Sequence, residues 1–227
     1  MAQRQDGRQS RWTQHNAERR LRILDAATAV IEAGPPGEEF HVQQIAEQAG
    51  LNRTAVYRHF DDRADLDRAI RAHVLDGLTA TLLPAVNLDG TVNEIIRRIV
   101  STYVDWVVEH RALHAFAVHE VSGPAEQGAD QIAAALAELL QTVIVVLGAD
   151  LDDDERALVD PLAHGLVGAV FGAVRRWVSL EPRRPDADRV SELLAHSVWS
   201  LLDGHARRIG LHLDPDRPIV ELLPAAE

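Results

Sequence analysis

The sequence predicts an all-α fold, in which an N-terminal three-helix head containing a helix-turn-helix precedes a larger C-terminal helical body. Three observations lead to this prediction. Apolar residues recur at helical spacing along most of the chain, no segment shows the alternation typical of a β-strand, and two short helical patterns flank Gly50. The chain has 227 residues, of which 46% are hydrophobic, so it can bury a substantial core.

The head is predicted to contain three helices and the start of a fourth. The first runs over residues 16–33 and ends at the Gly-Pro-Pro-Gly segment 34–37, because glycine and proline terminate helices. The second covers residues 42–49 and stops at Gly50, which tolerates the left-handed conformation past a helix end. Asn52 is a good N-cap for the third helix, over residues 53–59. Asp62 begins a fourth helix that extends to about Leu83.

The body continues the helical pattern. Helices are predicted over residues 91–110, 131–148, about 152–180 and from Pro185 onward, and Pro161 should kink the third of these. The helix at 131–148 is apolar nearly all round, so other helices should surround it. After Gly210 the chain is predicted to be irregular.

Charge is distributed unevenly along the chain. The formal net charge is -12, which argues against a protein that coats nucleic acid or membrane by bulk attraction. Residues 1–76 hold 11 arginines against 12 acidic residues, whereas residues 77–227 hold 12 against 23. A polyanionic partner would therefore meet the N-terminal third. The longest charge-free run, Pro161–Val174, is shorter than the ~20 residues of a membrane helix, and the chain lacks cysteine and a signal segment, so we expect a cytoplasmic protein without membrane contact.

Residues 40–60 have the pattern of a helix-turn-helix. Small Ala46 faces the bend, Gly50 makes the turn, and Leu51 and Val56 fill the space beneath it. The outer face of the second helix then presents side chains suited to base edges and phosphates in a major groove. These side chains are Arg53, Thr54, Ala55 and His59.

The segment IAEQAGLNRTAVYRHFDDRADL, Ile45 to Leu66, resembles the DNA-binding signature of the TetR family of bacterial transcriptional regulators. The resemblance covers about residues 18–75 and implies a homodimer with an N-terminal reading head and a variable effector-binding body. It divides the chain into a flexible arginine-containing tail (1–15), a helix-turn-helix DNA-binding domain (16–75) and a ligand-binding and dimerisation domain (76–227).

The resemblance also assigns DNA contacts. The family's phosphate contacts fall on Tyr57, His59 and Arg63, and its base readers fall on Gln43, Arg53, Thr54 and Ala55. The sequence departs from the family pattern at three positions. His41 stands where a Ser or Thr usually caps the second helix, Arg63 replaces the usual Lys, and Asp61 replaces a common Pro.

Small residues indicate a close helix contact in the body, and the resemblance implies that the last two helices form the dimer interface. Gly165, Gly168 and Gly172 lie on one helix face, and each costs ~1 kcal/mol relative to Ala in a helix interior, so a close helix contact is the expected reason for them. The last helix adds a regular apolar stripe. Its predicted interface residues are Leu194, Val198 and Leu201.

The predicted effector pocket is apolar. Tyr103, Trp106, Phe116 and the apolar helix at 131–148 are candidate walls, and His114, His119 or Glu120 are candidate polar contacts. This lining favours an apolar or amphiphilic small molecule. His110 and His114 have metal spacing but no HExxH motif or carboxylate frame, so neither a metal nor a cofactor is predicted.

The sequence thus favours a ligand-responsive transcriptional repressor that binds a double-stranded, palindromic DNA operator. Two alternatives remain open at this point. One is an architectural DNA-binding protein without an effector, against which the acidic body argues. The other is an all-helical enzyme around His114, His119 and Glu120, which lacks a nucleophile constellation or a phosphate loop.

Overall fold

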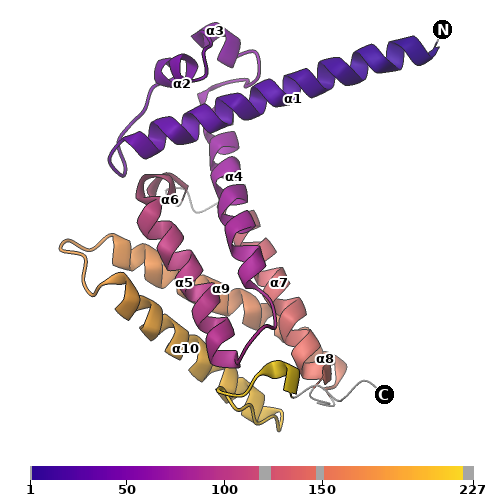
Figure 1. The fold of residues 1–227 in the computed structure, drawn as a ribbon, viewed down its shortest axis with the longest axis vertical. Coiled ribbons are helices and arrows are strands. Elements are labelled where there is room, and N and C mark those ends of the chain that lie inside the picture. Colours follow the sequence, from indigo (N-terminus) through magenta and orange to yellow (C-terminus); the bar gives the residue numbers. More distant parts are fainter. Residues whose placement is uncertain (1, 118–123, 147–150, 222–227) are drawn as a thin grey trace. The chain divides into compact units, whose positions relative to one another are not determined.

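The computed structural model describes residues 2–117, 124–146 and 151–221. Every regular element in these ranges is helical, apart from one isolated β-bridge between Thr91 and Pro218. The chain forms two compact units (Figure 1). Unit 1 comprises residues 1–75 and 110–125, and unit 2 comprises residues 76–109 and 126–227.

Unit 1 is built from α1 (Ala2–Ala33), α2 (Val42–Gln48), α3 (Arg53–Val56), the first part of α4 (Arg63–Leu82) and α6 (Arg111–Ala117). Both α2 and α6 pack against α1. The core of this unit consists of apolar side chains with 2% exposure or less. They are Ile23, Ala27, Ile45, Ala46, Val56, Phe60, Leu66, Ile70 and Ala117.

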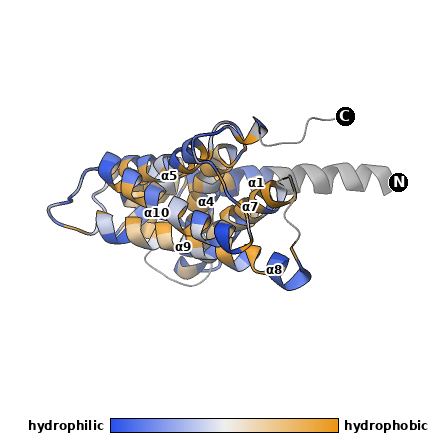
Figure 2. Ribbon diagram, turned by 90° about the horizontal axis from the view of Figure 1, so that it is seen from below, coloured by the Kyte–Doolittle hydropathy of each residue, from blue (hydrophilic) through white to orange (hydrophobic). Residues whose placement is uncertain are grey.

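Unit 2 contains the end of α4, the short 3-10 helix η1 (Leu83–Ala85) and five further α-helices. These are α5 (Val92–Glu109), α7 (Pro124–Val146), α8 (Asp153–Ala157), α9 (Val159–Val178) and α10 (Ala187–Arg208). A second 3-10 helix, η2 (Ile219–Glu221), follows them. The most extensive packing joins α5 to α10. Figure 2 shows apolar residues along α5, α7, α9 and α10, which together enclose the interior of the unit.

The structure differs from the predicted elements in three places. The helix α1 begins at Ala2, where a tail without regular structure was expected over residues 1–15. The predicted helix 152–180 is not one kinked helix but two, α8 and α9, which meet at Leu158; Pro161 then lies in the first turn of α9, where its missing N–H costs nothing. Residues 110–125, expected in the body, belong to unit 1.

Candidate nucleic-acid interface and internal cavity

The turn between α2 and α3 is fixed by a small set of local interactions. Gly50 has φ +67°, which a glycine adopts without strain, and the Leu51 amide donates to the Ala46 carbonyl at 2.8 Å. The Asn52 side chain accepts the Ala55 amide at 2.8 Å and so caps α3, as predicted. Ala46 and Val56 are fully buried beneath the turn. The two helices are therefore held as one rigid reading element.

The predicted base readers lie on the outside of this element. Gln43, Arg53 and Thr54 are exposed, and Ala55 is half-buried. The Gln43 amide donates to the Glu47 carboxylate at 2.7 Å, and the Arg53 guanidinium lies 5.7 Å from the centre of the Tyr57 ring. Arg53 and Tyr57 thus form one continuous polar surface, in which the aromatic ring supports the cation.

His59 lies at the end of the reading element, beside the arginines of α1. Its carbonyl accepts a hydrogen bond from Arg20 at 2.5 Å, and Arg20 also stacks on the ring of Phe60 at 4.2 Å. Burial lowers the pKa of His59, and the charges of Arg19 and Arg20 lower it further. His59 therefore presents a neutral imidazole next to two permanent cations, a surface suited to a phosphate.

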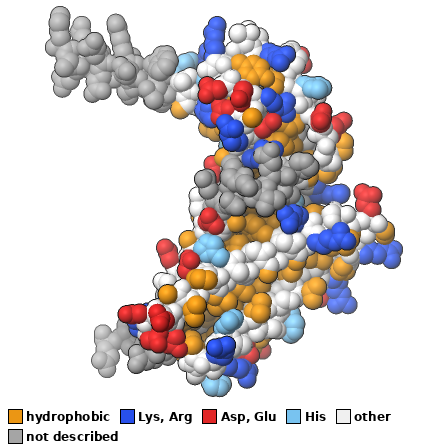
Figure 3. All heavy atoms as spheres, turned by 180° about the vertical axis from the view of Figure 1, so that it is seen from behind, with side chains coloured by type: hydrophobic (Ala, Val, Ile, Leu, Met, Phe, Trp, Pro, Cys, Tyr) orange, Lys and Arg blue, Asp and Glu red, His pale blue; other side chains and the backbone are white. Residues whose placement is uncertain are grey.

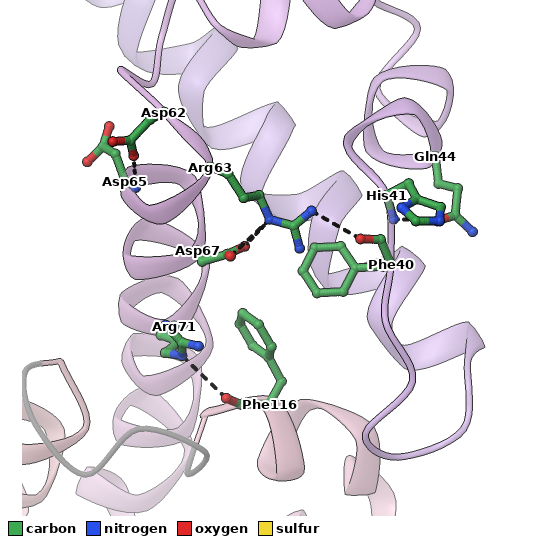
Figure 4. Close-up of polar contacts among 9 residues, drawn as sticks. All are labelled: Phe40, His41, Gln44, Asp62, Arg63, Asp65, Asp67, Arg71 and Phe116. Carbon is green, nitrogen blue, oxygen red and sulfur yellow. Dashed lines mark hydrogen bonds and ion pairs between the residues drawn. The ribbon is translucent and has the colours of Figure 1, made fainter.

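Arg63 is held by contacts within unit 1 (Figure 4). Its Nε donates to both carboxylate oxygens of Asp67, at 2.8 and 2.9 Å, and its Nη1 donates to the Phe40 carbonyl at 3.1 Å. The guanidinium also lies 4.5 Å from the centre of the Phe40 ring. Arg63 therefore joins the start of α4 to the segment before α2, and a phosphate would have to share it with these partners.

The same stack continues to α6. The rings of Phe40 and Phe116 meet edge to face at 5.4 Å, and the largely buried Arg71 lies 4.8 Å from the Phe116 ring centre (Figure 4). The Nε of Arg71 also donates to the Phe116 carbonyl at 3.4 Å. Two cations thus enclose two aromatic rings that come from α6 and the segment before α2. No periodicity or motif in the sequence indicates this cluster.

The departures from the family pattern at the helix starts are compensated locally. The His41 amide donates to the Gln44 side chain at 2.6 Å, so Gln44 takes over part of the missing cap of α2. At α4, Asp62 accepts the Asp65 amide at 2.7 Å, and the Asp61 amide donates to Asp65 at 3.1 Å. Both helices therefore begin with satisfied amides.

Unit 2 encloses an apolar cavity of about 600 Å³. Side chains from α5, α7, α9 and α10 form most of its wall, and residues 82–88, 211–213 and Ile219 complete it. Among its many lining residues, Tyr103, Glu155, His205 and Arg208 are the polar ones, and the others are almost all aliphatic. A cavity of this size and character is typical of a small-molecule site.

The predicted pocket residues lie in different places. Tyr103 belongs to the cavity wall, where its ring stacks on Phe171 at 4.4 Å. Trp106 is buried but is not part of the lining, and Phe116 belongs to the stack in unit 1. His119 lies outside the described residues. The predicted apolar helix 131–148, also expected among the pocket walls, corresponds to α7, whose side chains between Ile132 and Ile144 line the cavity.

The predicted interface residues also divide into two groups. Gly165 and Gly168 are exposed, and a side chain added at Gly165, Gly168 or Gly172 would meet open space within the chain. Leu201 is 48% exposed and Leu193 is 61% exposed. By contrast, Leu194 is buried and Val198 lines the cavity, so both face the interior of unit 2. Figure 3 shows hydrophobic side chains along this side of the molecule, with the acidic side chains of α8 at one end.

Within the described residues, one stretch is long and apolar enough to cross a membrane by length and composition. It is Asp153–Val178, with 28% of its 18-residue window buried. From the sequence alone, no membrane-spanning stretch is expected. The stretch consists of two helices, and a core helix of a soluble protein has the same composition, so this finding assigns no membrane. Among the same residues, no group of three or more His, Asp and Glu side chains could hold a metal ion.

Comparisons with known proteins agree with this architecture. Residues 23–70 match the profile of bacterial regulatory proteins of the tetR family. An uncharacterized HTH-type transcriptional regulator of Mycobacterium tuberculosis (strain H37Rv) is 30% identical over 204 residues, covering 88% of this chain and 83% of that protein. The HTH-type transcriptional repressor LfrR of Mycolicibacterium smegmatis is 36% identical over 86 residues, covering 38% of this chain and 44% of the repressor.

A solved tetR-family transcriptional regulator from Streptomyces coelicolor has the same fold, with a TM-score of 0.64 at 18% identity; the likeness covers 92% of this chain and 90% of that one. The fixed turn, the exposed recognition helix and the relatives together define a helix-turn-helix DNA-binding transcriptional regulator, not an enzyme. The chain belongs to the TetR family of bacterial transcriptional regulators.

Proposed function

We propose that this regulator is a cytoplasmic homodimeric repressor, which a small apolar or amphiphilic molecule releases from a palindromic operator. The observation that carries the proposal is the apolar cavity of about 600 Å³ in unit 2, in a chain whose unit 1 carries the DNA-reading element. A regulator that only bound DNA would have no use for such a space. Binding of a ligand there and of DNA to the head are then coupled reciprocally.

In this proposal the exposed face of α2 and α3 reads DNA. Arg53 and Thr54 are fully accessible and stand on a helix fixed by the Asn52 cap, so they can reach base edges in a major groove. Tyr57, His59 and Arg63 flank them as phosphate contacts, with Gln43 and Ala55 beside the bases. The neutral His59 next to Arg19 and Arg20 suits this arrangement, because a phosphate would meet cations on both sides.

The exposed sides of α9 and α10 form the proposed dimer interface. Three glycines in the interior of α9 have no neighbour that explains them within the chain, since each faces open space. Leu193 and Leu201 leave large apolar surface on α10 uncovered. A second copy of the chain would cover this surface, and the glycines would let the two backbones approach closely. This replaces Leu194 and Val198, which face inward, by Leu193 at the proposed contact.

A dimer also explains how a recognition helix as short as α3 acquires useful affinity. Two heads would bind half-sites about one helical turn, ~34 Å, or a multiple of it apart, so the operator should have two-fold symmetry. The experiment that tests the proposal begins by selecting preferred duplexes from a random pool with the full chain. Fluorescence anisotropy then compares the selected operator with a scrambled duplex of equal length.

A palindromic site, a dimer by sedimentation, and release of the operator by an apolar compound are the expected results. Gly168→Leu should give monomers that stay folded by circular dichroism, because the added side chain meets open space within one chain. An intact dimer in Gly168→Leu would refute the interface. Equal affinity for all duplexes would favour an architectural DNA-binding protein instead.

A further inference from the structure

The cavity in unit 2 is elongated along its helices. Its lining runs from Val92 to Tyr103 on α5, from Val159 to Phe171 on α9 and from Val198 to Arg208 on α10. At a rise of 1.5 Å per residue, each of these walls is about 15 to 18 Å long. A compact ring system would fill only part of this length, whereas an extended chain would follow it.

At one end of the cavity the lining includes two aromatic rings. Tyr103 is 3% exposed and stacks on Phe171 with ring centres 4.4 Å apart. Burial raises the pKa of Tyr103, so its phenol stays neutral. The charge of Arg175 acts on Tyr103, but Arg175 is not among the lining residues, so the cavity wall at this end is uncharged and suits the end of a hydrocarbon chain.

The opposite end carries the charged residues of the lining. Glu155 lies on α8, and His205 and Arg208 lie in the last turn of α10. Glu155 already accepts the Asp152 amide at 3.1 Å as part of the cap of α8. Arg208 is exposed and, among the side chains that the structure describes, has no carboxylate partner. Its neighbour Arg207, by contrast, is paired with Asp203 at 2.9 Å. Among the described residues, Arg208 is thus a cation without an acidic partner at this end of the cavity.

Between these ends the wall consists of aliphatic side chains, and most of those that α7 contributes are partly uncovered. On α7 the half-buried lining residues are Leu136, Leu139, Leu140, Val143 and Ile144. Covering apolar surface is favourable in proportion to its area, so this wall is stabilised by any hydrocarbon that covers it. It contains no partner for a charged or strongly polar group, which excludes sugar phosphates and nucleotides from the interior.

We propose that the cavity binds one long-chain amphiphile with a carboxylate headgroup, its hydrocarbon chain reaching towards Tyr103 and Phe171 and its carboxylate beside Arg208. This inference rests on the proposed function, since it names the class of effector for the same regulator. The chain supplies affinity through burial of methylene groups. The carboxylate supplies the direction of insertion, because only one end of the cavity offers a cation.

The test measures binding of saturated fatty acids to the full chain without DNA, by isothermal titration calorimetry. We expect one molecule per protomer, with affinity rising about four-fold per added methylene from octanoate upward until the cavity is filled, then levelling off. Dodecanol and dodecylammonium serve as controls with the same chain. Arg208→Glu should weaken dodecanoate at least ten-fold and leave dodecanol unchanged, and the matched variant Arg207→Glu should behave like the wild type.

A second variant probes the closed end. Val170→Trp fills space beside Phe171, so the affinity should level off at a shorter chain. Equal affinity for the carboxylate, the alcohol and the ammonium compound would overturn the proposed headgroup, and binding of ring systems alone would overturn the chain. Because these measurements contain no DNA, fatty-acid binding without operator release would contradict the proposed repressor and leave this inference intact. Operator release by another compound class, with no fatty-acid binding, would overturn this inference and leave the proposed repressor intact.

Discussion

The two units use their large side chains in opposite ways. In unit 1, Phe40 and Phe116 are enclosed between Arg63 and Arg71 by directional contacts that join segments far apart in the sequence. In unit 2, leucines, isoleucines and valines of α5, α7 and α9 line a hollow, and those that α7 contributes from Leu136 to Ile144 stay partly uncovered. Unit 1 is therefore tightly packed and held by contacts between distant segments, whereas unit 2 contains an apolar cavity.

This difference follows from what each part has to do. A reading element must hold its exposed side chains at fixed positions against DNA, and rings between guanidinium groups resist displacement because both packing and charge favour one geometry. A ligand site must keep apolar surface free, which forgoes stability that a filled core would have. Substitutions that remove similar side-chain volumes should therefore lower the free energy of unfolding by different amounts in the two units.

The largest expected effect comes from removing the ring at the centre of the stack. Phe40 is 8% exposed and contacts both Arg63 and Phe116. Phe40→Ala should lower the free energy of unfolding by about 3 kcal/mol, through lost burial and the cavity left behind. The matched variant Leu140→Ala, on the wall of the hollow, should cost below about 1 kcal/mol because its side chain is only half-buried.

Urea denaturation followed by circular dichroism measures both variants. The comparison between the units predicts a clear difference in the urea midpoint at equal slope. A loss in Leu140→Ala as large as that in Phe40→Ala would mean that the cavity wall is packed like a core. In that case the contrast drawn between the two units would be wrong.

The next effect concerns the outer face of the reading unit. Arg53 is exposed and its guanidinium lies over the Tyr57 ring, so its removal should leave stability nearly unchanged. If Arg53 reads a base, Arg53→Ala should cost about 1 to 3 kcal/mol of operator binding and relax the preference at one position. Anisotropy on the operator and a scrambled duplex measures this, and equal loss on both would remove its role as a base reader.

The reading element could be predicted from sequence because its determinants are local. Gly50, Asn52 and the buried Ala46 and Val56 lie within a few residues of one another, and each has a backbone or packing reason that a single segment reveals. The stack between Phe40 and Phe116 could not be predicted in this way. Its partners are 76 positions apart along the chain, and only the tertiary arrangement brings the two rings together.

The body was predicted correctly as helical, but the sequence identified only part of the lining of its cavity. Apolar stripes show which face of a helix turns inward, and they do not show whether that interior is full or hollow. The aromatic Trp106 and Phe116, expected in the pocket wall, do not line the cavity, whereas the apolar helix 131–148, also expected there, does. Likewise, the apolar stripe predicted for the last helix includes both Leu194, which is buried inside unit 2, and Leu201, which is exposed.

A smaller effect separates two roles of Arg63, as a structural residue and as a phosphate contact. Arg63→Lys keeps the charge and loses the paired hydrogen bonds to Asp67, so it should lower stability by about 1 kcal/mol, a modest value because the Arg63 side chain is 41% exposed. Salt titrations of operator binding give the number of phosphates contacted, and they are made with Arg63→Gln, which removes the charge that Arg63→Lys keeps. An unchanged salt dependence with reduced stability assigns Arg63 to structure. A shallower dependence with unchanged stability assigns it to the phosphate.

The smallest effect depends on pH and concerns His59. Because burial and the neighbouring Arg19 and Arg20 lower its pKa below the ordinary 6.5, the folded state resists protonation more than the unfolded chain does. As the pH falls below about 6.5, the unfolded chain takes up the proton first, and stability decreases until the lowered pKa of the folded state is reached. Above that window His59 is neutral in both states and its contribution is constant.

The affinity for DNA should depend on pH in the opposite direction to the stability of the free protein. A phosphate beside His59 favours the protonated imidazole, so operator affinity should rise as the pH falls through the same window, while the stability of the free protein falls. His59→Gln should abolish both trends, and comparing wild type with variant removes the contributions of the other histidines. Urea unfolding and anisotropy at pH values from about 5.5 to 8 measure them. If stability depends on pH through His59 but operator affinity does not, the imidazole lies in the head without touching phosphate.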